Sequence, residues 1–278
     1  YLFYASANTS SCKRIYFFTP NKIMKKIICI ANQKGGVGKT TTAINLSASL
    51  AAAEKKTLLI DGDSQSNSTS GMGADRSSFQ TNNLYHALIG QVPLEQVIIN
   101  TIIPNLDIAP STQDLIGIEV EFVGLEDKEK KLKNLLNSLD RQYDYIVIDC
   151  PPSLGMMTIN ALVASDFLIV PLQCEYFAME GLGYLLNTVK MVKAQLNPQL
   201  VLGGILLTMF DQRNLLSRRV TDDVRQHFGD KVFKTVIPRN VRLSESPSHG
   251  LPIILYDIKS RGALAYMEMA QEIIRGRL

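Results

Sequence analysis

Short apolar runs alternate with longer stretches of helical periodicity along most of the chain. The runs are rich in Ile, Val and Leu, and several are apolar at consecutive positions instead of at every second one. Continuous apolar strands are typical of a parallel sheet that is covered by helices on both faces. The predicted strands are residues 27–31, 57–61, 106–109, 145–149, 167–171, 203–208 and 232–237.

The stretches between the predicted strands carry leucines and valines at helical spacing. Two such stripes are formed by Leu132, Leu135, Leu136 and Leu139 and by Leu182, Leu185, Leu186, Val189 and Leu196. The alternation of strand and helix predicts an α/β fold with a doubly wound, mostly parallel sheet flanked by helices. No internal repeat or long linker interrupts the pattern, so we expect one domain over residues 24–278, with a last helix over residues 262–275.

The first 23 residues differ from the rest of the chain. They contain no acid, no clear periodicity and no Met at position 1, whereas Met24 is followed at once by the first predicted strand. We therefore expect residues 1–23 to be a leader or extension outside the native fold, with Met24 as the true start. A signal peptide is the alternative, but Cys12, Lys13 and Arg14 split the apolar clusters of this segment.

Composition and charge narrow the possible classes. Hydrophobic residues make up 46% and charged residues 20% of the chain, which excludes a largely disordered or fibrous protein. The formal net charge is +3, but three of the 29 Lys and Arg residues precede residue 24, which leaves 26 bases against 26 acids. Any basic surface must therefore be local. No apolar run is long enough to suggest a membrane-spanning helix.

The cysteines and histidines show no pattern of a metal site. Cys12, Cys29, Cys150 and Cys174 form no CxxC pair, and the three histidines are scattered. So few cysteines in a chain of this length are typical of a reducing compartment. We expect the protein in the cytoplasm.

A glycine-rich segment follows the first predicted strand and opens a helical run. Glycines let backbone N–H groups turn toward phosphate oxygens, and a helix N-terminus adds a partial positive charge. Lys39 is placed to reach the β- and γ-phosphates, and Thr40 to put its hydroxyl on Mg²⁺. An unliganded turn is the alternative. The predicted nucleotide-binding residues of this loop are Lys34, Gly35, Gly36, Val37, Gly38, Lys39, Thr40 and Thr41.

Two further predicted strands end in carboxylates. One ends in Asp61, followed by Gly62 and Asp63, and the other ends in Asp149. Because the carboxyl ends of parallel strands form the ligand-binding edge of such a sheet, we expect these side chains near the loop. Asp149 would hold Mg²⁺ through water together with Thr40, and Asp63 would position a water that attacks the γ-phosphate. A turn or helix-capping role is the alternative for Asp63.

The loop and the acidic segments resemble the ParA/MinD-type ATPases, in which KGGVGKT is a deviant form of the phosphate loop. The resemblance implies a P-loop NTPase fold, ATP and Mg²⁺ as cofactors, and hydrolysis of ATP to ADP and phosphate. It also implies that Lys34 crosses an ATP-bound dimer to the partner's phosphates, and that Lys34, Lys39 and Asp63 act in catalysis. The family usually has Pro at the position of Ser64 and Gly at that of Ser66, so we expect a looser loop there.

A third strand end and a downstream segment supply candidates for the base pocket. Met209 follows the predicted strand 203–208, and residues 236–250 read VIPRNVRLSESPSHG. In the family, this Pro-Arg-Asn stretch lies beside the adenine. The resemblance therefore implies that Pro238 and Asn240 contact the base, with Met209 near them. An ordered loop without a ligand is the alternative.

Residues 213–242 are locally basic, with eight Lys and Arg residues against three Asp. On a helix, Arg218 and Arg225 share a face opposite a predicted apolar stripe of Leu216, Val220, Val224 and Phe228. A merely solvated charged face is the alternative to a DNA-binding one. The family binds DNA without sequence preference through basic residues of this region. The DNA contacts that the resemblance implies are Arg213, Arg218, Arg219, Arg225 and Arg242.

From about residue 24 to residue 274 the chain resembles a chromosome- or plasmid-partitioning ATPase of the ParA/Soj group. The resemblance implies a homodimer that forms on ATP, binds double-stranded DNA non-specifically at the nucleoid, and is stimulated in hydrolysis by a ParB-type centromere-binding protein. A MinD-like, membrane-cycling division-site ATPase and a metabolic P-loop enzyme of the same superfamily are the alternatives. The sequence GALAYMEMAQEIIRGRL has no added basic amphipathic tail, so we expect no stable membrane association.

Overall fold

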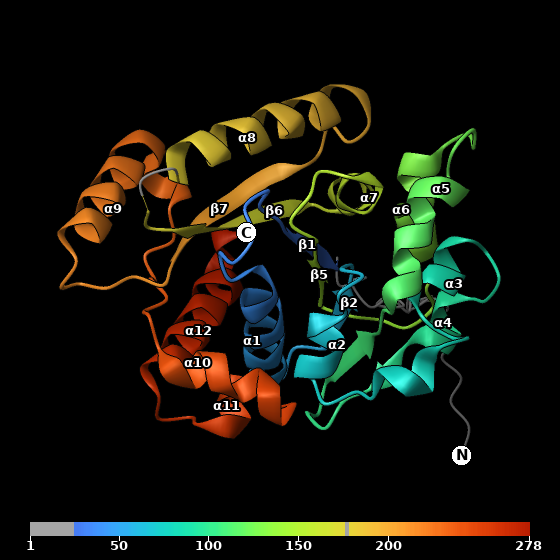
Figure 1. The fold of residues 1–278 in the computed structure, drawn as a ribbon, viewed down its shortest axis with the longest axis horizontal. Helices are drawn as coiled ribbons and strands as arrows, with labels where there is room; N and C mark the ends of the chain where they lie inside the picture. The colour runs from blue at the N-terminus through green and yellow to red at the C-terminus, as the bar shows by residue number, and fades with distance from the viewer. Residues whose placement is uncertain (1–24, 176–177) are drawn as a thin grey trace, which may run out of the picture.

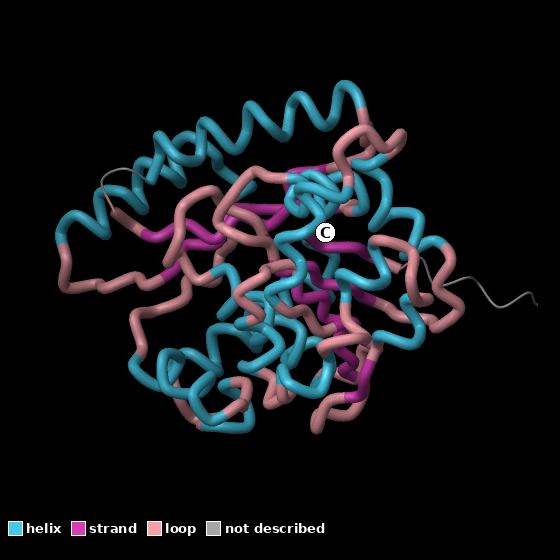
Figure 2. Tube along the Cα trace, turned by 45° about the vertical axis from the view of Figure 1, so that its right-hand side comes forward, coloured by secondary structure: helices cyan, strands magenta, loops and turns pink. Residues whose placement is uncertain are grey.

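Every residue of strand β1 (Lys26–Ile30) after the first is buried, as expected of a strand with helices on both of its faces. Its side chains alternate between two apolar clusters, with Ile27 and Cys29 in one and Ile28 and Ile30 in the other. The computed structural model describes residues 25–175 and 178–278, and the sheet is the middle of its three layers (Figure 1, Figure 2). The predicted leader, residues 1–23, and Met24 lie outside the described residues.

The other strands of the sheet are β2 (Thr57–Asp61), β3 (Ile99–Asn100), β4 (Leu106–Ala109), β5 (Tyr145–Asp149), β6 (Phe167–Gln173) and β7 (Val201–Thr208). Their order in the sheet is β3-β4-β2-β5-β1-β6-β7. Only the short pair β3–β4 is antiparallel among the pairs of this sheet. The predicted doubly wound, mostly parallel sheet is therefore confirmed, although β3 was not anticipated.

The predicted strand at residues 232–237 is wrong. This segment makes only two isolated bridges to β7 and the turn after it, at Val232 and at Pro238. Between them, the carboxylate of Glu272 accepts hydrogen bonds from the backbone N–H groups of Lys234, at 3.2 Å, and Thr235, at 2.6 Å. Phe233 and Ile237 still donate to carbonyls of β7, both at 2.9 Å, so the ladder is interrupted between them, where Glu272 takes the N–H of Thr235.

The helices form two layers. Helices α3 to α9 contribute to the apolar cluster on one face of the sheet, and helices α1, α10, α11 and α12 contribute to the cluster on the other. The helices are α1 (Lys39–Ala52), α2 (Asn67–Gly71), α3 (Leu84–Leu88), α4 (Leu94–Val97), α5 (Ile118–Glu121), α6 (Lys131–Asn137), α7 (Met156–Ala164), α8 (Ala178–Gln195), α9 (Leu215–Phe228), α10 (Val241–Glu245), α11 (Ile253–Tyr256) and α12 (Arg261–Glu272).

The last helix ends earlier than predicted. Helix α12 gives way to a π-helical turn over Ile273–Arg277, in which Gly276 has a φ of 99°. The carbonyl of Leu278 then accepts a hydrogen bond from Nζ of Lys26, at 2.8 Å, which places it at the amino end of β1. Along residues 25–175 and 178–278, no helix has the length and apolar character needed to cross a membrane.

The strand order brings the predicted site together at one edge of the sheet. Strand β1 lies between β5 and β6, and its carboxyl end leads into the glycine-rich loop and α1. Asp61 and Asp149 are register partners at the carboxyl ends of β2 and β5. In doubly wound sheets this edge is where ligands bind, at the point where the chain reverses its direction of winding.

Two glycines fix how α2 meets the segment that precedes α11. Gly73 and Gly250 both have a positive φ, of 76° and 64°, and their backbones touch. A Cβ added to Gly250 would lie 2.7 Å from Cα of Gly73, which is closer than real Cβ contacts allow. Only glycine therefore fits at this crossing.

We expect Gly250→Ala to reduce the free energy of unfolding about twice as much as Gly90→Ala. Both substitutions place a methyl group on a backbone of positive φ, which costs about 1–2 kcal/mol. A Cβ on Gly90 meets no atom within 4 Å, whereas one on Gly250 must displace Gly73. Urea unfolding of the two variants measures the difference, and equal losses would show that the contact imposes no constraint.

Candidate functional site

The glycine-rich loop is anchored to two strands by side chains. Asn32 donates from Nδ2 to the carbonyl of Pro171 in β6, at 2.7 Å, and its Oδ1 accepts from the backbone N–H of Lys34, at 3.0 Å. Thr208, at the end of β7, donates from Oγ1 to the carbonyl of Val37, at 2.8 Å. These hydrogen bonds hold the loop against the sheet before any ligand binds.

The loop has the backbone that a phosphate cradle requires. Gly36 and Gly38 have φ angles of 72° and 86°, and α1 begins directly after Gly38. Lys39 is 6% exposed, and its Nζ donates to the carbonyl of Lys34 at 3.0 Å, so its ammonium group lies over the loop. Burial lowers the pKa of Lys39, and the nearby Asp149 carboxylate opposes that shift.

The second lysine of the loop is held by an ion pair on its own chain. Nζ of Lys34 lies 2.6 Å from Oε2 of Glu175, just beyond β6, and both side chains are nearly half exposed. The other carboxylate oxygen of Glu175 accepts from Nε2 of Gln173 at 2.5 Å. This ion pair must open before Lys34 can reach another molecule.

Asp149 is fully buried, and its two carboxylate oxygens are unlike each other. Oδ2 accepts a hydrogen bond from the hydroxyl of Ser68 at 2.8 Å, whereas Oδ1 is buried without a partner among the described residues. Burial, with the neighbouring Asp61, raises the pKa of Asp149 to about 7, and hydrogen bonds from Ser68 and Thr40 act in the opposite direction.

Asp61 is satisfied by α2. Its Oδ2 accepts from the backbone N–H of Thr69 at 2.7 Å and from the Thr69 hydroxyl at 2.6 Å, and its Oδ1 accepts from the N–H of Asp63 at 3.2 Å. Burial raises the pKa of Asp61 to about 6. With all these donors taken up, Asp61 fixes the position of α2, and Asp149 is the better placed of the two to hold a metal ion.

The residues at this edge fit a magnesium ion. The unpaired Oδ1 of Asp149 is a buried acceptor in need of a positive partner, and the Thr40 hydroxyl is close enough to form a hydrogen bond with the same carboxylate. Carboxylate and hydroxyl oxygens suit Mg²⁺, which also keeps several of its waters. The predicted metal-binding pair of Thr40 and Asp149 is therefore brought together.

Asp63 lies beside this pair on the loop between β2 and α2. It is 7% exposed, and its Oδ1 accepts from the N–H of Gln65 at 2.9 Å. Its backbone carbonyl accepts from the Ser111 hydroxyl at 2.7 Å. Ser66 has a φ of 54°, a backbone conformation that glycine adopts more readily, which accounts for the family's glycine there. A looser loop at Ser64 and Ser66 stays a prediction.

A cavity of about 390 Å³ adjoins the loop on the side of α10. The three residues predicted for the base pocket, Met209, Pro238 and Asn240, all line it, together with Gly38 and Thr41 of the loop. Oδ1 of Asn240 accepts from the N–H of Arg242 at the start of α10, which leaves its amide N–H groups for other partners. The site residues that sequence reasoning missed here include Thr208 and Tyr266.

Two arginines of the basic region are exposed without a partner. The side chains of Arg218 and Arg219 on α9 are exposed and form no hydrogen bond or ion pair with any described residue. The other three are engaged. Arg213 is paired with Asp211 at 3.1 Å, Arg242 with Glu245 at 2.9 Å, and Arg225 donates to the carbonyls of Phe233 and Lys234.

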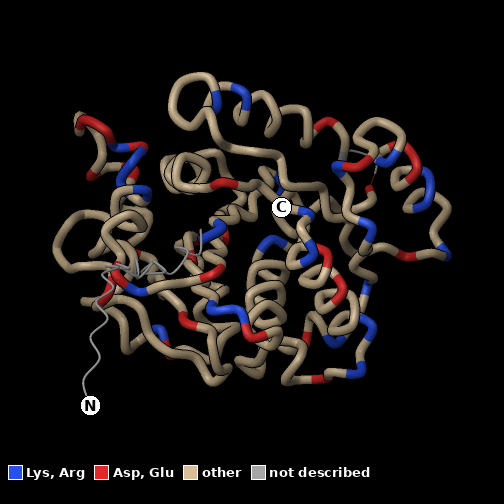
Figure 3. The backbone as a smooth tube through the Cα atoms, turned by 180° about the vertical axis from the view of Figure 1, so that it is seen from behind, with Lys and Arg blue, Asp and Glu red and all other residues tan. Residues whose placement is uncertain are grey.

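The predicted apolar stripe of α9 is wrong at Leu216. This side chain is 42% exposed, whereas Val220 and Val224 are buried as expected and Phe228 packs against the core. The buried positions of α9 begin instead at Ser217, in its first turn, and continue through Val220, Thr221 and Val224. Figure 3 shows Lys and Arg recurring around α9 and the stretch toward α10, with acidic residues among them.

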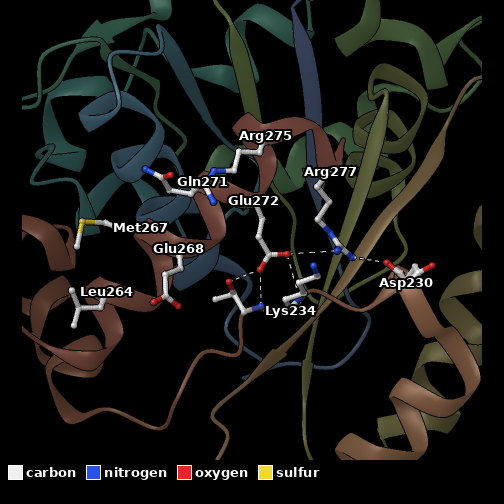
Figure 4. A pocket seen from close by; sticks show the side chains of 10 residues that line it. Asp230, Lys234, Leu264, Met267, Glu268, Gln271, Glu272, Arg275 and Arg277 are labelled. Atoms are coloured by element: carbon white, nitrogen blue, oxygen red, sulfur yellow. Dashed lines mark hydrogen bonds and ion pairs between the residues drawn. The ribbon is translucent and has the colours of Figure 1, made fainter.

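A larger cavity, of about 830 Å³, lies between α12 and the segment after α9 (Figure 4). None of its lining residues belongs to the phosphate loop. The charged side chain at its centre, Glu272, is already engaged by Thr235 and lies 3.6 Å from Arg277. Arg277 in turn lies 4.0 Å above the ring of Phe233. These groups hold α12 against its neighbours.

Other residues that the sequence did not reveal are Ser68, Thr69 and Glu175. Ser68 and Thr69 belong to a polar run whose only signal is the density of hydroxyl residues after the Asp-Gly-Asp segment. Cys150 is buried, as expected for a small core residue, and its Sγ lies 3.4 Å from that of Cys29.

Comparison with known proteins agrees with this geometry. A family model described as an AAA domain matches residues 25–202. The chain is 52% identical over 250 residues to the chromosome partitioning protein ParA of Myxococcus xanthus, which covers 90% of this chain and 88% of that protein. It is also 52% identical over 250 residues to the sporulation initiation inhibitor protein Soj of Bacillus subtilis, with 90% and 98% covered.

A solved structure of cobyrinic acid a,c-diamide synthase from Mycobacterium smegmatis, with bound ADP and magnesium, superposes with a TM-score of 0.80. The two sequences are 36% identical, and the match covers 91% of this chain and 95% of that one. The P-loop fold expected from the sequence is therefore confirmed.

The raised pKa of Asp149 predicts a pH dependence of stability. Because folded Asp149 keeps its proton up to about pH 7 while unfolded Asp loses it near pH 4, the folded state binds more protons between these values. Without Mg²⁺, stability should therefore fall as pH rises from 4 to 7. Asp149→Asn should flatten this fall and raise stability at pH 7, by at most about 4 kcal/mol for a three-unit shift.

Thermal unfolding between pH 4.5 and 7.5 in the presence of a chelator measures the effect. Asp222→Asn, on the exposed side of α9, is the control and should keep the slope of the unsubstituted protein. An unchanged slope in Asp149→Asn would contradict the assignment.

Proposed function

Because this chain belongs to the ParA/Soj family of chromosome-partitioning proteins, we propose that it is an ATPase that acts as a dimer switch in chromosome or plasmid partitioning. One observation carries the proposal. Lys39, the unpaired oxygen of Asp149 and the carboxylate of Asp63 converge at one edge of the sheet, beside a cavity lined by Met209 and Asn240.

The chain's own groups account for the binding of ATP and Mg²⁺. The N–H groups of the loop and the N-terminus of α1 bind the phosphates, and Lys39 exchanges the carbonyl of Lys34 for phosphate oxygens. Thr40 and Asp149 would hold Mg²⁺, which would supply positive charge to neutralise the phosphate chain. Asp63 orients the attacking water and accepts its hydrogen bond. The cavity beside α10 takes the base.

Lys34 makes the dimer part of the mechanism. In the chain as it stands, its ammonium group is neutralised by Glu175. When two copies close around two molecules of ATP, Lys34 leaves this ion pair and contacts the partner's phosphates, where a second positive charge stabilises the transition state. Hydrolysis then removes the contact that holds the dimer together.

Binding of DNA follows from the basic region of the dimer. Arg218 and Arg219 present charges that no described carboxylate neutralises. Each phosphate contact adds affinity that is lost as salt rises. Arg213 and Arg242 also bind DNA when they exchange their carboxylate partners, Asp211 and Glu245, for phosphates of the DNA. A ParB-type centromere-binding protein stimulates hydrolysis, and the cycle takes place at the nucleoid.

A metabolic activity is the second candidate, because the synthase from Mycobacterium smegmatis has the same fold at 36% identity. The 52% identity to partitioning proteins over nearly the whole chain favours partitioning. ATP turnover that responds to a small carboxylic-acid substrate, and not to DNA with a partner protein, would favour the metabolic reading. Co-sedimentation with liposomes tests the membrane-cycling alternative.

We expect ATP-dependent binding to random-sequence duplex DNA, strengthened by Asp63→Ala, which blocks hydrolysis. The double variant Arg218→Ala/Arg219→Ala should weaken it about tenfold or more at low salt and reduce its dependence on salt. Lys56→Ala is the control, since this exposed lysine precedes β2 and lies outside the basic region. Co-sedimentation with ATP, ADP or no nucleotide at two salt concentrations measures all four proteins. Retention that ignores the nucleotide would remove the partitioning function.

We expect Lys34→Ala to bind ATP but not to dimerise on it, because the charge that crosses to the partner is lost. Lys56→Ala is the control, since this exposed lysine precedes β2 at the opposite edge of the sheet. Light scattering with ATP and Mg²⁺, in the background of Asp63→Ala, gives the mass of each variant. A dimer of Lys34→Ala would contradict the role of this lysine.

A further inference from the structure

Helix α2 contacts both buried carboxylates at the edge of the sheet through consecutive residues. The hydroxyl of Ser68 donates to Oδ2 of Asp149 at 2.8 Å, and Thr69 donates twice to Asp61. Ser68 and Thr69 are both fully buried. Helix α2 is therefore hydrogen-bonded to the ends of two neighbouring strands, β2 and β5.

The hydrogen bond from Ser68 determines which oxygen of Asp149 remains for a ligand. With Oδ2 taken, the unpaired Oδ1 is the oxygen that is left to face a metal ion. A hydroxyl that donates to one oxygen also fixes the rotation of the carboxylate about its last bond. Without Ser68, Oδ2 would lose this donor, and among the described residues only the hydrogen bond from Thr40 would remain to orient the carboxylate.

Ser68 is also tied to the loop that carries Asp63. The N–H of Ser66 donates to the carbonyl of Asp63 at 2.9 Å, and the hydroxyl of Ser111 donates to the same carbonyl at 2.7 Å. Asp63 and the start of α2 are thus joined by short-range hydrogen bonds. Because Ser68 follows Ser66 by two residues, we expect a shift of Ser68 relative to Asp149 to move Asp63 as well.

We propose that Ser68 is a positioning residue that couples occupation of the magnesium site at Asp149 to the placement of Asp63 for hydrolysis. The inference rests on the proposed ATPase function. The hydroxyl of Ser68 orients the carboxylate of Asp149. The backbone of Ser68 belongs to the same segment as Asp63, which positions the attacking water. Loss of this hydroxyl weakens binding of Mg²⁺ and slows hydrolysis together.

The test compares Ser68→Ala with Ser70→Ala. Ser70 lies on the same helix and bonds to the carbonyl of Ser66, at 3.1 Å, instead of to Asp149. The affinity of each protein for a fluorescent ATP analogue is titrated without Mg²⁺ and then against rising Mg²⁺. We expect Ser68→Ala to bind the analogue normally in the absence of the ion and to need about tenfold more Mg²⁺, because a hydrogen bond to a charged group is lost.

Two further measurements separate positioning from general damage to the fold. Ser68→Thr, which keeps the hydroxyl, should recover the dependence on Mg²⁺. Hydrogen exchange in residues 64–71 should slow on addition of ATP and Mg²⁺ in the unsubstituted protein and in Ser70→Ala, but not in Ser68→Ala. The turnover number at saturating Mg²⁺ should fall about tenfold in Ser68→Ala alone.

The outcomes distinguish this inference from the function on which it rests. Equal Mg²⁺ dependence in Ser68→Ala and Ser70→Ala would overturn the role of Ser68 and leave the ATPase intact. If the unsubstituted protein binds no nucleotide with Mg²⁺, the proposed function itself fails. A Ser68→Ala protein that also loses binding of the analogue without Mg²⁺ would show a purely structural role, and would likewise overturn the inference.

Discussion

The burial of two carboxylates side by side is the constraint on which the rest of this edge depends. Asp61 and Asp149 end adjacent parallel strands at the same level of the sheet, and neither is exposed to solvent. A buried carboxylate is costly unless hydrogen bonds or an opposite charge compensate for the lost water. Helix α2 supplies donors to both, which is why a helix of only five residues holds its position between the loop of Asp63 and the strands.

The two buried carboxylates are not compensated equally by hydrogen bonds, and this difference determines which of them can bind a metal ion. Asp61 is fully satisfied and serves as an anchor, whereas Asp149 keeps one buried oxygen without a partner. Burial and the neighbouring Asp61 raise the pKa of Asp149 to about 7, so a cation that binds there near neutral pH displaces a proton from about half of the molecules. Lys39, folded over the loop, supplies positive charge on the side of the phosphates. The chain thus places the ammonium group of Lys39 and a carboxyl oxygen without a partner on the side of the sheet that carries the loop.

How far the sequence predicts this arrangement depends on the range of each interaction. The parallel strands and the loop depend on short stretches of sequence, which a local pattern reveals. The strands predicted at residues 57–61, 106–109 and 145–149 are therefore confirmed. The strand predicted at residues 232–237 is wrong because Glu272, far along the chain, accepts from Lys234 and Thr235 in the middle of the segment and interrupts its pairing with β7. The prediction that Leu216 is buried is wrong. Periodicity shows which positions share a face of a helix, but it does not show how much of that face the core covers at the start of the helix. Glu175 pairs with Lys34 and Ser68 bonds to Asp149, and both partners are far away in the sequence, so no local pattern reveals these contacts.

The ion pair between Lys34 and Glu175 has a kinetic consequence. Half-exposed ion pairs of this kind contribute about 0.2–1 kcal/mol, so the pair is open in roughly 15–40% of molecules at any moment. In the dimer that we propose, each copy supplies one such lysine, so the two pairs together reduce the apparent affinity of assembly by at most about fortyfold. Exchange of the side chain is also far faster than the encounter of two proteins at cellular concentrations. The pair therefore screens the charge of Lys34 but opens too readily to act as a kinetic barrier to the proposed assembly.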